Sequence, residues 1–262
     1  MVRPDQESEN GNGDARQGAR KPDQQAIPVA LTAVAIAYHL DGVAALALSP
    51  TTIARIFAGE IKMWNDPAIG KDNPGVALPA IAIVATRASA GRPASVALAT
   101  FVGRAAPGVW HVKHGASWPD GVPYNDFEPG RGDAVKTTNG AVTYLELPTA
   151  AVLELPLARV RNRAGVFVAP TAASTTAAGE PVVVDKELFF DPIDAPGNSA
   201  YPIVYASWAV TDRKPSDQVR TPWIRAYLAF LLGDGQALLE QGPYGRLPAA
   251  VIKRALAAIG KP

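Results

Sequence analysis

The segment AIAIVATRASAGRPASVALATFV, residues 80–102, contains a complete strand, turn and helix pattern, and the rest of the chain is interpreted around it. Residues 81–84 are rich in isoleucine and valine and predict a short buried strand. The polar, glycine-containing stretch Arg87–Arg92 predicts a turn. Pro93 suits the first position of a helix, where its missing N–H is not needed, and the apolar side chains after it predict a helix with one buried face.

The turn before this helix has the properties of an anion-binding site. The first N–H groups of a helix have no partner within the helix, and the helix dipole places partial positive charge at the same end. Arg87 and Arg92 would add guanidinium groups, which bind oxyanions through paired hydrogen bonds. The alternative is an ordinary β-turn-α connection without a ligand, and the segment alone does not decide between the two.

The composition of the chain limits the classes of function. Its 262 residues allow one large or two modest domains, and 48% hydrophobic residues are enough for a buried core. A formal net charge of +1 argues against nucleic acid as a partner. The lack of cysteine excludes disulfides and thiolate metal sites, and the pair His111 and His114 is too small for a metal site. No metal and no cofactor is therefore expected.

The order of polar and apolar segments predicts the fold class. Residues 1–26 are polar and predict a disordered tail without the apolar core of a signal peptide. Strand-like segments such as residues 27–38 and 202–210 then alternate with helix-like ones, which is typical of an α/β fold. The GRGD segment at 130–133 is interpreted as a turn leading into a helix, and not as a cell-adhesion tripeptide, because three residues often recur by chance.

Four dispersed segments together resemble one family of proteins. They are Leu48–Pro67 (LSPTTIARIFAGEIKMWNDP), Arg161–Thr171 (RNRAGVFVAPT), Ser199–Val204 (SAYPIV) and the C-terminal run GPYGRLP that ends at Pro248. In this order they resemble the phosphate-binding protein of Pst-type ABC importers, a PstS-like member of the periplasmic binding protein superfamily. The resemblance extends from about Ile27 to the end of the chain.

The resemblance implies an α/β fold of the type II periplasmic-binding-protein class, in which two lobes joined by hinge strands clamp phosphate between them. Residues 27–40 and 201–262 would form the hinge strand and an incomplete lobe I, and residues 41–200 would form lobe II with the anion loop. The family's N-terminal βαβαβ unit, which builds most of lobe I, has the polar tail in its place here. We therefore expect an uncovered apolar patch on the helix after Thr221. The patch would consist of Trp223, Tyr227 and Phe230.

The anion loop departs from the family pattern, which is roughly Arg-x-Asp-Gly-Ser-Gly-Thr-Ser. Aligned without gaps, Arg87 is kept and the family's aspartate becomes Ser89. The second glycine becomes Arg92 and the threonine becomes proline, although a one-residue shift would bring Ser95 to a hydroxyl position. The lost hydrogen bonds would weaken phosphate binding about a thousandfold or more, before any gain from Arg92. The candidate phosphate-binding residues are Arg87, Ser89, Gly91, Arg92 and Ser95.

The resemblance implies a solute-binding protein that recognises phosphate or a related oxyanion for ABC-type import. Its partners would be the importer's membrane subunits, and its location would be extracytoplasmic. The alternative is a degenerate PstS-like module that serves as a protein-interaction or scaffold domain, with a partner chain or a second copy over the open patch. A third reading is that the coding sequence extends upstream of Met1. An enzyme is not expected, because a cysteine nucleophile, a Gly-x-Ser-x-Gly motif and a Walker loop are all lacking.

Overall fold

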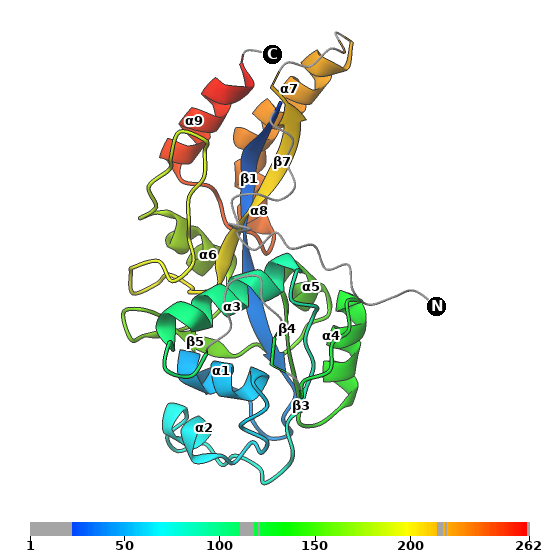
Figure 1. The fold of residues 1–262 in the computed structure, drawn as a ribbon, viewed down its shortest axis with the longest axis vertical. Helices are drawn as coiled ribbons and strands as arrows, with labels where there is room; N and C mark the ends of the chain where they lie inside the picture. The colour runs from blue at the N-terminus through cyan, green and yellow to red at the C-terminus, as the bar shows by residue number, and fades with distance from the viewer. Residues whose placement is uncertain (1–22, 111–117, 120, 214–216, 218, 261–262) are drawn as a thin grey trace.

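The computed structural model describes residues 23–110, 118–119, 121–213, 217 and 219–260 (Figure 1). Residues 1–22 of the predicted tail and the two neighbouring histidines after Trp110 lie outside this part of the chain. The alternation of strands and helices confirms the predicted α/β class. The elements are β1 (Gln24–Tyr38), β2 (Ala47–Leu48), α1 (Pro50–Phe57), α2 (Pro67–Asp72), β3 (Val84–Ala85), α3 (Pro93–Ala105), α4 (Glu128–Thr137), β4 (Ala141–Glu146), α5 (Leu147–Val152), β5 (Arg159–Arg161), β6 (Phe167–Val168), α6 (Ala172–Gly179), β7 (Val204–Asp212), α7 (Arg220–Leu232), α8 (Gly235–Gln241) and α9 (Ala249–Ile259).

Strand β1 joins the lower and upper parts of the molecule in Figure 1. It pairs antiparallel with β4 over Val34–Tyr38 and with β7 over Gln24–Ala33. Its nearly continuous buried run is typical of a strand covered on both faces. The strand includes residues 24–26, which were expected in the tail, because ladder pairing with β7 continues to Val210–Asp212. The division of the chain into two lobes stays a prediction.

A four-stranded sheet in the order β3-β4-β1-β7 extends from the lower into the upper part of the molecule, and the lower part also contains a three-stranded sheet in the order β2-β5-β6. Helices α1 and α3 contact each other, and α4 and α5 contact β4. Three buried aromatic side chains lie at the centre: the ring of Tyr144 is 5.3 Å from that of Phe57 and 5.6 Å from that of Trp118. These contacts fix the end of β4 against α1 and against the segment that leads to α4.

The expected strand at residues 81–84 is shorter and more exposed than predicted. Only Val84 and Ala85 form β3, and Val84 is 45% exposed. The residues before them pair elsewhere, since the N–H of Ile83 donates to the carbonyl of Lys62 and that of Trp64 to the carbonyl of Ile81. Because β3 is the first strand in the sheet order, it pairs with β4 alone and is not buried between two strands.

The GRGD segment is helical, so its interpretation as a turn is wrong. Residues 130–133 lie inside α4, which begins at Glu128. Glycine is a poor helix former, but here it allows close packing. A Cβ added at Gly132 would lie 2.2 Å from Cδ1 of Leu153, so a side chain at this position would collide with the segment after α5. Tertiary packing therefore overrides the local preference for a turn.

Several helices begin at or directly after a proline. The hydroxyl of Ser49 accepts a hydrogen bond from the N–H of Thr52, and Pro50 begins α1. Pro93 is the first residue of α3, and Pro248 directly precedes α9. The fixed φ of proline and its missing donor suit the start of a helix, and the start predicted at Pro93 is confirmed.

The upper part of the molecule consists of the β1–β7 ribbon with α7, α8 and α9 (Figure 1). Helix α7 turns Leu228 and Leu232 inward, where they are buried. Its opposite side carries Trp223, Tyr227 and Phe230, which are 76%, 62% and 46% exposed. The predicted apolar patch is therefore confirmed for the described part of the chain. Among the residues that the structure describes, no helix has the length and hydropathy needed to cross a bilayer.

Candidate functional site

A cavity of about 210 Å³ lies where α3 and α4 begin and β4 ends. It is bordered by the turn before α3, by the segment that enters α4 and by the carboxyl end of β4. Two helices thus direct their N-terminal ends toward one region, which favours negative charge there. The lining residues are Ala88, Arg92, Pro93, Ala94, Asp126, Glu128, Arg131 and Glu146.

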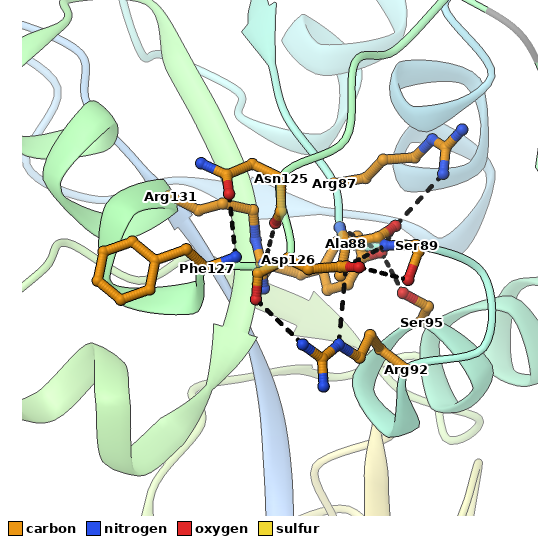
Figure 2. A network of polar contacts seen from close by, with 10 residues as sticks. Arg87, Ala88, Ser89, Arg92, Ser95, Asn125, Asp126, Phe127 and Arg131 are labelled. Atoms are coloured by element: carbon orange, nitrogen blue, oxygen red, sulfur yellow. Dashed lines mark hydrogen bonds and ion pairs between the residues drawn. The ribbon is translucent and has the colours of Figure 1, made fainter. Parts of the chain in front are cut away.

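The donors of the predicted anion turn already bind a carboxylate of the same chain. One carboxylate oxygen of Asp126 accepts from the backbone N–H of Ser89 at 2.8 Å, and the other accepts from the Ser89 hydroxyl at 2.9 Å. Arg92 Nε lies 3.7 Å from the carboxylate (Figure 2). The two hydrogen bonds from Ser89, and then the charge of Arg92, hold the pKa of Asp126 below its ordinary value. Asp126 therefore occupies the place that the sequence assigned to an oxyanion.

Arg87 does not reach this cavity. Its Nε donates to the carbonyl of Val122 at 3.0 Å, and its guanidinium carbon lies 5.8 Å from the ring of Trp118 and 5.5 Å from that of Tyr124. Figure 2 shows its side chain extending away from Asp126. Arg87 thus ties the turn to the segment before α4, with its charge stacked on aromatic rings.

Ser95 and Gly91 also have positions that the sequence could not specify. Ser95 is fully buried, and its hydroxyl lies 2.6 Å from that of Tyr144. The Tyr144 hydroxyl also accepts from the N–H of Ala88 at 3.1 Å, and burial raises the pKa of this tyrosine. Gly91 is exposed within the turn, with open space around its Cα. Of the five predicted residues, Ser89 and Arg92 are brought together around Asp126, whereas Ser95 faces β4.

Sequence reasoning missed Arg131, which lies in the first turns of α4. Only 2% of the residue is exposed, and its guanidinium donates to the carbonyls of Asn125 and Tyr144. Its Nε has no hydrogen-bond partner among the described residues. Burial lowers the pKa of the guanidinium, and the nearby Glu128 carboxylate partly offsets that effect. The only sequence signal was an arginine between two glycines, in a segment that was interpreted as a turn.

The remaining acidic side chains of the cavity are held by neighbours. One oxygen of Glu128 accepts from the backbone N–H of Glu146 at 2.8 Å. Glu146 in turn accepts from the hydroxyl of Tyr205 on β7, and burial together with this carboxylate raises the pKa of Tyr205. This contact connects the upper ribbon with the rim of the cavity. The cavity lining therefore contains two guanidinium groups and three carboxylates.

A family profile described as a PBP superfamily domain matches residues 1–235. With the mixed α/β fold described above, this match shows that the chain belongs to the PBP superfamily.

The relatives within that superfamily are phosphate-binding proteins by name. The chain is 32% identical over 235 residues to "Phosphate-binding protein PstS 3" of Mycobacterium leprae, a match that covers 85% of this chain and 62% of the relative. It is 31% identical over 258 residues to "Phosphate-binding protein PstS" of Methanocaldococcus jannaschii, with 88% and 66% covered. The chain thus spans just under two thirds of the length of these relatives.

A solved structure gives the same fold. The high-affinity periplasmic phosphate-binding protein PfluDING, solved with phosphate bound, superposes with a TM-score of 0.69 and 22% sequence identity. The superposition covers 89% of this chain and 71% of that protein. At this level of identity the similarity shows the fold alone.

Proposed function

We propose that this chain is a solute-binding protein that recognises phosphate or a related tetrahedral oxyanion for ABC-type import. The observation that carries the proposal is the cavity at the start of α3 and α4, which is lined by the guanidinium groups of Arg92 and Arg131. Similarity to proteins named as phosphate-binding supports the choice of phosphate. Guanidinium groups are suited to tetrahedral oxyanions because they donate parallel hydrogen bonds.

The five residues predicted from the sequence take three different roles in this proposal. Arg92 lines the cavity and would contact the anion. Ser89 would act through Asp126, which its N–H and hydroxyl bind. Arg87, Gly91 and Ser95 would give the turn its shape, because Arg87 and Ser95 bind other parts of the chain and Gly91 lies between them. We propose no catalytic step for this site.

The partners follow from the same proposal. The membrane subunits of an ABC importer would receive the anion, and the protein would act on the extracytoplasmic side of the membrane. PfluDING is a periplasmic phosphate-binding protein, which supports this location by analogy.

Isothermal titration calorimetry with inorganic phosphate tests the proposed function. We expect saturable heat with one anion per chain. The fold of the sample is checked by circular dichroism, so that a negative result is interpretable. A folded protein that gives no heat at about 10 mM phosphate, where binding of only about 3 kcal/mol would be detected, contradicts the proposal.

The apolar patch on α7 favours a second candidate function, in which the chain is an interaction module. In this candidate function, a second copy of the chain covers the patch. Strand β7 is the last strand in the sheet order, and an edge strand can pair antiparallel with its own copy about a twofold axis. Trp223 and Tyr227 would then be covered in the dimer. Sedimentation analysis tests this: a monomer at high concentration contradicts it, and a dimer that Trp223→Ser dissociates supports it.

A further inference from the structure

A buried arginine whose guanidinium pairs directly with no carboxylate of the described residues is the most unusual feature of the cavity. Arg131 is 2% exposed, and among the described residues no carboxylate forms an ion pair with its guanidinium. A buried charge is costly unless an opposite charge and hydrogen bonds compensate it. Two backbone carbonyls supply part of that compensation. The charges of Glu128 and Asp126 favour the ionised guanidinium, but neither carboxylate binds it, so its Nε–H remains without an acceptor among the described residues.

The Nε–H of Arg131 indicates where an anionic ligand would bind. Its two terminal nitrogens donate to the carbonyls of Asn125 and Tyr144, and its Nε–H has no partner in the part of the chain that the structure describes. Arg131 is also one of the residues that line the cavity. The Nε atom has almost no accessible surface, so an anion in the cavity would accept a charge-assisted hydrogen bond from this N–H after the guanidinium shifts toward it. Such bonds are about twice as strong as neutral ones.

The predicted turn offers less to an incoming anion. The N–H and hydroxyl of Ser89 both donate to Asp126, and Arg92 lies beside the same carboxylate. An oxyanion on the turn would have to displace Asp126 from these donors. An oxyanion beside Arg131 would displace no carboxylate hydrogen-bonded to that guanidinium, and it would lie near the charges of Glu128 and Asp126.

We propose that Arg131 is the group that receives the oxyanion, and that Asp126 excludes the anion from the turn at Ser89. This inference rests on the proposed function and gives it a location. The binding position is deeper than the turn, against the first turns of α4, with Arg92 at the rim. The carboxylate of Asp126 binds the donors of Ser89 and offsets the charge of Arg92, so the Arg131 guanidinium remains for the ligand.

Calorimetry with inorganic phosphate on three variants tests the proposal. Arg131→Lys keeps the charge but loses the Nε–H, and we expect affinity to fall by about 10- to 100-fold. Asp126→Asn removes the competing charge, and we expect equal or tighter binding. Arg161→Lys is the matched control, because Arg161 is exposed on β5 away from the cavity, and we expect affinity within about twofold of the parent.

A second measurement keeps the proposal testable if Arg131→Lys does not fold. In the unaltered chain, the Nε–Hε resonance of Arg131 is followed by NMR during titration with phosphate. We expect it to shift with the same midpoint as the calorimetric heat. A resonance that stays unchanged at saturating phosphate, or full affinity in Arg131→Lys, overturns the assignment while leaving the proposed function in place. If neither the unaltered chain nor Asp126→Asn gives any heat, the proposed function fails, and the assignment fails with it.

Discussion

The turn before α3 and the first turns of α4 border the same cavity but differ in how their polar groups are paired. In the turn, the N–H and hydroxyl of Ser89 and the guanidinium of Arg87 have partners within the chain. In α4, Arg131 is more deeply buried, and its Nε–H has no partner in the part of the chain that the structure describes. A turn whose sequence resembles an anion-binding loop can therefore have its hydrogen-bond donors bound within the chain. The guanidinium that remains for a ligand comes from the first turns of α4, which the sequence pattern did not indicate.

The largest expected effect is a difference in affinity between oxyanions that carry a proton and those that do not. Three carboxylates and two guanidinium groups line the cavity, so an oxyanion that keeps a proton can donate to a free carboxylate oxygen. Sulfate carries no proton near neutral pH, and we expect it to bind at least about tenfold more weakly than phosphate. Arsenate, which is protonated like phosphate, is the matched control in competition calorimetry. Equal affinity for sulfate and phosphate would mean that the carboxylates do not face the ligand.

Removing the Tyr144 hydroxyl, which binds the turn before α3, should lower the stability of the fold. Tyr144→Phe leaves the N–H of Ala88 and the hydroxyl of Ser95 without their partner in a buried site. We expect a loss of about 1–3 kcal/mol in the free energy of unfolding, measured with urea. Tyr124→Phe is the control, since Tyr124 is 65% exposed, and should change little. If Tyr144→Phe is as stable as the parent, the turn is held by other contacts.

The pairing of Asp126 with the turn predicts a smaller, pH-dependent effect. The pKa of Asp126 is lowered in the folded chain, so its ionised form stabilises the fold above the ordinary value of 3.8. That contribution is lost as the pH falls from 3.8 through the lower folded-state pKa. We therefore expect Asp126→Asn to be less stable than the parent at neutral pH and to approach it in acid. Urea unfolding at both pH values measures this, and a constant difference between the two chains would contradict it.

The smallest effect is expected far from the cavity, on the upper ribbon. Trp223 is 76% exposed, so Trp223→Ser should change the free energy of unfolding by no more than about 0.5 kcal/mol and leave phosphate affinity unchanged. Calorimetry and urea unfolding on the same sample measure both quantities. A clear loss of phosphate affinity would show that α7 and the cavity are coupled.

Local sequence signals predicted what depends on local structure. Pro93 placed the start of α3, and the apolar spacing of α7 identified the patch around Trp223. The position of Arg87 depends on Trp118 and Tyr124, which are more than twenty residues away in the chain, so no local pattern could orient it. The start of α4 was predicted too late in the chain because its glycines disfavour a helix in isolation, and Gly132 is explained only by its close approach to Leu153.

The same limit applies to the cavity. Arg131 and Asp126 reach it from one segment and meet the turn at Ser89 from another, and only the tertiary fold brings these segments together. The sequence could identify a turn rich in donors. It could not show that another part of the chain had already bound those donors.

Crystals grown with arsenate and measured at the arsenic absorption edge test whether Arg131 receives the oxyanion, because anomalous scattering locates the anion. The account predicts an anomalous peak inside the cavity, within hydrogen-bond distance of the Arg131 guanidinium, with Asp126 still bound to Ser89. A peak beside Arg87, or one on the turn at Ser89 with Asp126 displaced, would contradict it.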